Sequence, residues 1–80
     1  MKIRLQGSQG DLTAASNVGF ATAVRVYNSG GTDLLLTQKE GAAVVGTITI
    51  AKYTSEVIVK QPADTLEGGA ALKVVSIAQT

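Results

Sequence analysis

The chain is built from short runs in which apolar and polar residues alternate, and glycine, asparagine, serine or aspartate separates the runs. Residues 1–6 read MKIRLQ and residues 47–51 read TITIA, so every second side chain is apolar. A β-strand has this period of two because successive side chains point to opposite faces of its sheet. Such runs recur at intervals of about ten residues, which is typical of small all-β domains. We therefore expect an all-β fold, a small antiparallel β-sandwich or barrel of six to seven short strands, over the single domain 1–80.

Turn residues divide the expected strands. The Asn-Ser-Gly-Gly segment 28–31 is the strongest hairpin signal, because Asn and Gly adopt positive φ at little cost. Residues 39–41 predict another turn, and the valines 44–45 between two glycines predict a loop or a short edge strand. Segment 11–19 is ambiguous, since Asp11 can cap a single helical turn. The clear strands are residues 1–6, 20–27, 32–38, 47–51, 56–60 and 71–79, and the last is apolar on both faces, as in a strand covered on both sides.

The segment VKQPADTLEGG, residues 59–69, contains the only proline. Pro62 has no backbone N–H, so the strand before it must stop there. Asp64 can accept hydrogen bonds from nearby backbone N–H groups in a tight turn, and Leu66 can tuck back onto the end of the sandwich. The glycines 68–69 then let the chain reverse. A second interpretation stays open, in which Asp64 and Thr65 face a neighbouring subunit.

The residue types exclude most common catalytic sites. The chain has no histidine and no cysteine, so it cannot form a Ser-His-Asp triad, a thiol nucleophile, a disulfide or an ordinary zinc site. Ser55 with Lys52 and Asp64 with Glu67 are the remaining pairs with relevant chemistry, and both pairs fit solvated turns better than a cleft. We expect no enzymatic activity, no catalytic residues, no cofactor and no metal.

Charge and size indicate protein partners. Seven basic and six acidic residues give a net charge of +1, which provides no basic surface for nucleic acid or an anionic membrane. No apolar run is long enough to span a membrane, and the N-terminus lacks the pattern of a signal peptide. Only 16% of the residues are charged, and an 80-residue domain has a thin margin of stability. We therefore expect a homo-oligomer whose surface is covered by neighbours.

The positions of the three aromatic residues bear on one alternative function, that of a small β-barrel module that binds nucleic acid or a saccharide. Such modules stack bases on exposed aromatic side chains in a basic groove. We expect Phe20 in the core and Tyr27 and Tyr53 at strand ends as packing residues, which disfavours this alternative.

Two segments resemble a known group of proteins. VRVYNSGGTDLLLTQ is a strand, an Asn-Ser-Gly-Gly turn and an apolar strand, and GTITIAKYTSEVIVKQPADTLEGGAALKVVSIAQ adds a Thr-rich strand, a V-I-V-K strand, a P-A-D-T-L loop and a closing strand. This order resembles small virion structural proteins of tailed bacteriophages, notably those that infect marine bacteria and cyanobacteria. The resemblance covers roughly residues 21–78, and segment 1–18 has no counterpart in it.

The resemblance implies a non-enzymatic protein that is present in many copies and binds the major capsid protein or other virion subunits. A capsid decoration or cement subunit is the first expectation, and a tail, connector or fibre-base component is the alternative. Its location would be the virion, assembled in the cytoplasm of the host bacterium.

The N-terminal residues supply a candidate contact. Lys2, Ile3, Arg4 and Leu5 form an amphipathic strand that can add to an exposed sheet edge of a capsid subunit or sister copy. Segment 1–18 is in this interpretation an N-terminal strand or arm. The equal alternative is that residues 1–6 are the first strand of the sheet of the domain itself.

Overall fold

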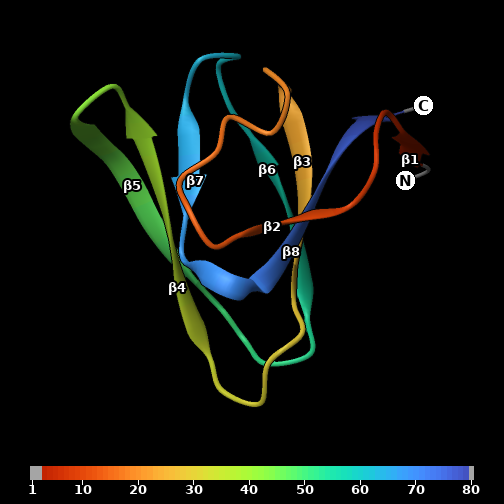
Figure 1. Cartoon of the computed structure of the whole chain (residues 1–80), viewed down its shortest axis with the longest axis vertical. Helices are drawn as coiled ribbons and strands as arrows, with labels where there is room; N and C mark the ends of the chain where they lie inside the picture. Colours follow the sequence, from red (N-terminus) through yellow and green to blue (C-terminus); the bar gives the residue numbers. More distant parts are fainter. Residues whose placement is uncertain (1–2, 80) are drawn as a thin grey trace.

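The computed structural model describes residues 3–79, and every regular element among them is a β-strand (Figure 1). The strands form two antiparallel sheets, which confirms the all-β fold and a small sandwich. Residues 3–79 form eight strands rather than six or seven, because two three-residue strands lie where the sequence predicts a helical turn or a tight turn. The strands are β1 (Ile3–Leu5), β2 (Gly10–Leu12), β3 (Ala23–Asn28), β4 (Leu34–Glu40), β5 (Ala43–Ile50), β6 (Ser55–Val59), β7 (Thr65–Glu67) and β8 (Gly69–Gln79).

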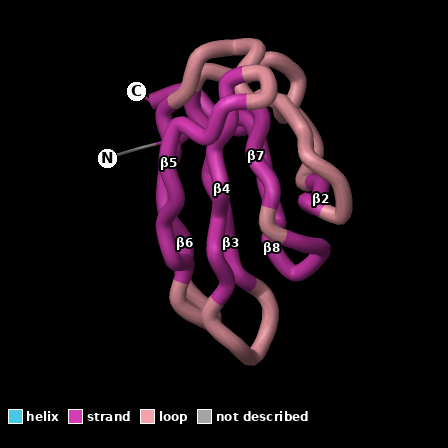
Figure 2. Tube along the Cα trace, turned by 90° about the vertical axis from the view of Figure 1, so that its left-hand side faces the viewer, coloured by secondary structure: helices cyan, strands magenta, loops and turns pink. Residues whose placement is uncertain are grey.

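The chain passes repeatedly between the two sheets. The first sheet has the order β1-β8-β3-β6, with β2 also paired to β8, and the second sheet has the order β5-β4-β7. Within residues 3–79, β4 and β5 are the only consecutive strands that pair with each other. The other connections from β3 onward carry the chain from one sheet to the other, and Figure 2 shows both layers from the side of β5. Crossings of this kind tie the two layers together at several points.

The alternating pattern places apolar side chains between the sheets. In β3, Val24 and Val26 are fully buried, while Arg25 and Tyr27 lie on the outer face with the Arg25 guanidinium 5.4 Å from the ring centre of Tyr27. The burial of each such valine is worth about 1.5–3 kcal/mol. The core consists of Leu12, Ala21, Val24, Val26, Leu36, Ile50, Leu66, Leu72 and Val74.

Strand β8 is central, as its two apolar faces predict. It pairs with β3 along one edge and with β1 and β2 along the other. Leu72 and Val74 face the core, and Val75 and Ile77 on the opposite face are only 5% and 2% exposed. This eleven-residue strand, with neighbours on both edges, is therefore the central strand of the first sheet.

The Asn-Ser-Gly-Gly segment is not a hairpin. It joins β3 in the first sheet to β4 in the second, so the expectation that these strands pair is wrong. The turn residues do reverse the chain, but β3 already has β6 and β8 as neighbours and has no free edge for β4. Ser29 stays bound to β8 of the first sheet, since its N–H and its hydroxyl both donate to the carbonyl of Ala71 at 2.9 and 2.8 Å.

Asn28 fixes this crossing from inside. Its side chain is fully buried, and its amide nitrogen donates to the carbonyls of Thr32 at 2.8 Å and Ile50 at 2.9 Å. Its side-chain oxygen accepts from the N–H of Gly30 at 2.9 Å. Its own N–H donates to the Thr54 carbonyl and its carbonyl accepts from the Tyr53 N–H, both at 2.9 Å. One residue thus joins the β3–β4 and β5–β6 crossings, with each of its polar groups satisfied.

Segment 11–19 forms a strand and a loop, so the helical turn proposed there is wrong. Gly10 and Asp11 pair with β8, and the Asp11 carboxylate accepts from the N–H and hydroxyl of Thr13 at 3.1 and 2.8 Å. These bonds, aided by Lys73, lower the pKa of the Asp11 carboxyl. Asp11 therefore stabilises a local turn after β2 rather than a helix start.

The β4–β5 hairpin turns at residues 41–42, next to the predicted turn. Gly41 has a φ of +61°, a conformation that glycine adopts without a steric cost. The valines 44–45 belong to an edge strand, which is one of the two predicted alternatives, but that strand extends to Ile50. Its register with β4 shifts at Val45, because Gln38 pairs with Gly46 and Lys39 pairs with Val44.

Gly68 carries the chain from β7 to β8 through a tight space. A Cβ at this position would lie 2.7 Å from the backbone oxygen of Leu35 and would also collide with the side chain of Leu72. The predicted role of the glycines 68–69 in reversing the chain is consistent with this packing.

Replacement of Asn28 tests its role. In Asn28→Ala the buried Ile50 carbonyl loses its side-chain donor, so we expect the free energy of unfolding to fall by about 2–4 kcal/mol in chemical denaturation. Asn28→Asp should not restore it, because a carboxylate oxygen would face two carbonyl oxygens. The control is Asn17→Ala, which removes one longer bond to the N–H of Phe20 and should cost less than about 1 kcal/mol. Equal losses in the two alanine variants would contradict this account.

Candidate functional site

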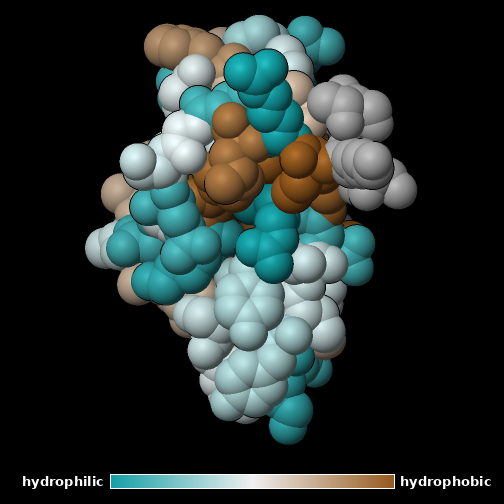
Figure 3. Space-filling model, turned by 90° about the vertical axis from the view of Figure 1, so that its right-hand side faces the viewer, coloured by the Kyte–Doolittle hydropathy of each residue, from teal (hydrophilic) through white to brown (hydrophobic). Residues whose placement is uncertain are grey.

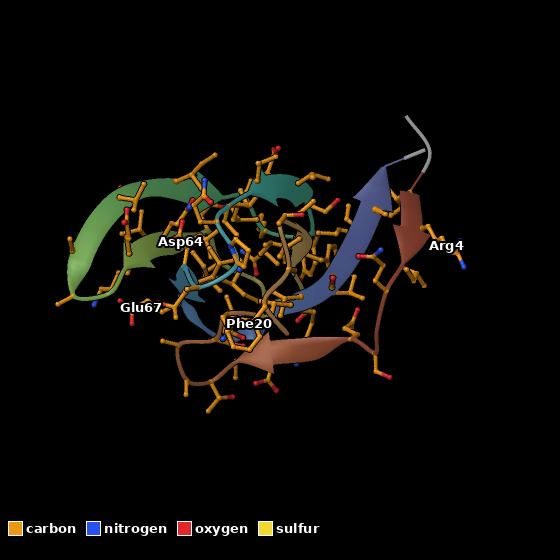
Figure 4. The ribbon with its side chains drawn as sticks, turned by 90° about the horizontal axis from the view of Figure 1, so that it is seen from above. Arg4, Phe20, Asp64 and Glu67 are labelled. Atoms are coloured by element: carbon orange, nitrogen blue, oxygen red, sulfur yellow. The ribbon has the colours of Figure 1, made fainter. Side chains whose placement is uncertain are left out.

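The predicted N-terminal contact strand lies in the sheet of the domain itself. Ile3, Arg4 and Leu5 pair with β8, and the Gln6 N–H donates to the Ser76 carbonyl at 2.8 Å. All three side chains are exposed, and Figure 4 shows Arg4 pointing away from the body of the molecule. Lys2 lies outside the described residues. The geometry thus favours the interpretation of β1 as the first strand of the domain over that of a detached arm.

The other predicted contact, Asp64, is used within the chain. It is only 5% exposed, and one carboxylate oxygen accepts from the Gln61 N–H at 3.1 Å and from the side-chain amide of Gln38 at 3.2 Å. The Asp64 N–H also donates to the Gln61 carbonyl at 3.0 Å. Asp64 therefore does not face outward as a contact role requires, and the turn interpretation is the one that its bonds support. Thr65 is half-buried at the start of β7, opposite Lys39.

Lys60 follows β6 and is buried at 5% exposure, which the sequence did not indicate. Its ammonium donates to the carbonyls of Gln61 and Pro62 at 3.3 and 3.2 Å. Burial lowers the pKa of Lys60, and the nearby Asp64 carboxylate offsets part of this effect. Lys60 and Asp64 thus form a buried polar group around the proline turn, at the end of the sandwich opposite Asn28.

Most exposed apolar side chains lie on or near strand edges. The β4–β5 hairpin leans away from the first sheet, as Figures 1 and 4 show, and β5 is exposed on both faces from Ala43 to Thr49. Val44, Val45 and Ile48 are 58%, 56% and 44% exposed. No strand within residues 3–79 pairs with the outer edge of β5. The signal in the sequence is that segment 41–51 contains no charged residue.

An apolar cleft opens between the sheets beside this hairpin. It has a volume of about 230 Å³, and Leu36, Ile48 and Ile58 supply most of its surface. Ile48 is on the core-facing side of β5 by its register with Leu36, yet it remains 44% exposed. The cleft is the open side of the sandwich, and its polar side chains are limited to Gln38 and Thr47.

The outer face of the first sheet is a second apolar surface. Figure 3 shows apolar residues gathered in its upper half, interrupted by hydrophilic side chains. Leu5 and Val59 are the most exposed of the residues that register places there, at 64% and 73%. Two shallow depressions flank this area, one including Ile3 and Arg25 and the other including Val59 and Ile77.

Phe20 is exposed rather than buried, so its predicted place in the core is wrong. It is 65% exposed and has a φ of +58°, and Val18 and Gly19 before it have φ values of +53° and +65°. Three consecutive left-handed residues turn the chain so that Val18 packs on the core and Phe20 faces outward (Figure 4). Bonds from Val18 N–H to the Ser16 hydroxyl and from Ala21 N–H to the Val18 carbonyl hold this strained turn.

The two tyrosines differ from each other. Tyr27 is half-buried near the end of β3, as expected, beside Arg25 and opposite Ser55 at the start of β6. Tyr53 is 62% exposed in the β5–β6 crossing with a φ of +59°.

The described residues bring together no group of three or more His, Cys, Asp or Glu that could hold a metal ion. Glu67 pairs with Lys39 at 2.9 Å on the outer face of the second sheet and makes no hydrogen bond with Asp64, which faces Gln38 and Gln61. Across residues 3–79, no helix could cross a membrane. Comparison with family models, curated proteins and solved structures found no match to the chain.

Removal of the Asp64 carboxylate tests the turn. In Asp64→Ala the Gln61 N–H and the Gln38 amide lose an acceptor, and we expect a loss of about 1–3 kcal/mol in the free energy of unfolding of the isolated domain. Glu40→Ala, at an exposed carboxylate, should change stability by less than about 0.5 kcal/mol. If Asp64→Ala keeps the full free energy of unfolding, the turn interpretation is contradicted and a contact role for Asp64 is favoured.

The buried ammonium of Lys60 predicts a pH dependence. Its folded pKa lies below the ordinary value of 10.5, so between these two values the unfolded chain binds more protons than the folded chain. Stability should therefore rise with pH in that window, relative to Lys60→Gln, and the difference should level off above 10.5. Denaturation of both variants from pH 7 to 11 measures this. A difference that falls as pH rises would contradict burial as the dominant effect.

Proposed function

We propose that this chain is a non-enzymatic structural subunit of a tailed-bacteriophage virion, and that it decorates the capsid by binding the assembled shell. The family indication comes from the sequence resemblance over residues 21–78. The observation that carries the proposal is the distribution of exposed apolar side chains, which lie on the β5 edge, on the outer face of the first sheet and at both ends of the sandwich. Nine large apolar residues among residues 3–79 are exposed: Ile3, Leu5, Phe20, Leu35, Val44, Val45, Ile48, Tyr53 and Val59.

Such a distribution suits a subunit with several neighbours. A standard protein interface buries about 800 Å² on each partner. The accessible surface of this chain is 4659 Å², so one such interface would cover about a sixth of it. A cement subunit acts by bridging adjacent shell proteins, and this requires at least two separate contact surfaces. Apolar side chains on opposite sides of a small rigid sandwich supply them.

Within the virion, a tail, connector or fibre-base position is the alternative to the shell. A binding module for nucleic acid or a saccharide is the alternative outside it. Tyr53 is the one strongly exposed tyrosine, and its backbone lies close to the Arg25–Tyr27 pair, since its N–H donates to the carbonyl of Asn28 and Tyr27 pairs with Ser55. With a net charge of +1, the electrostatic term that supplies non-specific binding to nucleic acid is weak.

Two measurements test the proposal. Mass spectrometry of purified particles of the virus that carries this gene should find the chain in many copies relative to the portal protein, and its absence from particles would contradict a virion role. Titration with oligo(dT) at low and moderate salt should show no binding. Binding that weakens steeply as salt increases would favour the nucleic-acid module instead.

A further inference from the structure

The four edges of the two sheets are protected to different degrees. The edge beside β8 is divided between β1 and β2, which have three residues each. The edge of β7 is covered, because Ser16 and Leu66 exchange backbone hydrogen bonds at 3.0 and 2.8 Å. Strand β6 has five residues and carries Glu56. Short, covered or charged edges are the usual defences against pairing with another chain.

The β5 edge is not short, covered or charged, and its register irregularity is confined to Val45, which has no partner on β4. It is eight residues long, reads AVVGTITI, and contains neither a charge nor a proline. It presents a row of backbone groups with no second partner among the described strands, flanked by exposed Val44 and Val45. A strand of this composition pairs readily with another extended chain.

We propose that β5 pairs antiparallel with β5 of a second copy of this chain, about a two-fold axis perpendicular to the second sheet. The two three-stranded sheets then form one continuous six-stranded sheet. A second copy fits because it supplies an edge of equal length that also lacks charge, so no ionic group is desolvated or repelled when the two edges meet. This inference stands independently of the virion proposal, since it concerns only the pairing of the chain with itself.

The symmetry constrains which residues meet. A two-fold axis perpendicular to the sheet places side chains of the same face opposite each other, so Thr47 and Thr49 meet residues of their own face and not Gly46 or Ile48. Cross-strand pairs between threonines are favourable. On the inner face, Ile48 gains cover from the same face of the partner, which reduces its exposure of 44%.

Charges at the two ends favour the antiparallel direction. The hairpin end of β5 lies beside Glu40, and its other end leads into Lys52. Both residues are exposed, and neither takes part in the ion pair found among residues 3–79, which joins Lys39 to Glu67. Antiparallel pairing brings the Glu40 end of each copy to the Lys52 end of the other, whereas parallel pairing would bring like charges together.

The first test compares two lysine variants. The wild-type chain should be dimeric by size-exclusion chromatography with light scattering, with dissociation toward monomer on dilution. Val45→Lys places a charge on the β5 edge strand and should raise the dimer Kd at least about tenfold. The matched control is Val59→Lys, which changes a valine of similar exposure on β6 and should leave the dimer intact. Circular dichroism melting shows that both variants fold, and Thr49→Lys replaces Val45→Lys if that variant does not.

The second test uses the absence of native cysteine. Single cysteines at positions 45 to 49 should form disulfide-linked dimers with a maximum at the residue nearest the axis and less on either side, because only that residue lies opposite itself. Ser8→Cys, in an exposed loop, is the control and should not crosslink above background. A wild-type chain that is monomeric at millimolar concentration, a dimer that survives both lysine variants on β5, or crosslinking that is equal at all five positions would overturn the proposal.

Discussion

The buried amide of Asn28 is the interaction on which the rest of the arrangement depends. The chain crosses between its sheets at 29–33 and again at 51–54, and Asn28 bonds to both crossings through its side chain and its backbone. In a small core, an unpaired amide or carbonyl at this point would cost as much as several buried methyl groups contribute. Because every polar group of Asn28 has a partner, the crossings are fixed relative to each other, and the positions of β4 and β5 follow from that.

The two sheets are also joined by hydrogen bonds at the end of the sandwich opposite Asn28. There Asp64 bonds to Gln38 of β4, and Ser16 pairs with Leu66 of β7. All these ties lie along β4 and β7 or at the Asn28 end, and none reaches the tip of the β4–β5 hairpin. The hairpin therefore diverges from the first sheet, and the cleft beside Ile48 and Ile58 opens between them. The exposed apolar surface of β5 is thus a consequence of where the layers are joined.

The sequence predicted the strands well and their partners poorly. Alternation located β3, β4, β6 and β8 because period-two burial is a local property of a half-buried strand. The turn residues of segment 28–31 predict a hairpin, and this prediction is wrong. Turn residues indicate that the chain reverses, but they do not indicate whether the next strand stays in the same sheet. Phe20 was placed in the core by its residue type, and the left-handed backbone at 18–20 that turns it outward has no signal in its neighbours beyond Gly19. The contact residues were sought at β1 and Asp64, since a terminal strand and a polar loop are visible locally, whereas the free edge of β5 depends on the order of strands in the finished sheet.

The unpaired edge of β5 has a consequence for the stability of this small domain. An 80-residue chain without disulfides has little stability to spare, and binding of a partner to the folded state adds stability by mass action. Residues 37–49 of the β4–β5 hairpin supply no side chain to the core, so a partner strand on β5 would add hydrogen bonds and apolar contacts where the domain itself supplies few. If β5 pairs as proposed, oligomerisation and folding of the hairpin are one process, and the lack of charge along β5 is a requirement of that process rather than an accident of composition.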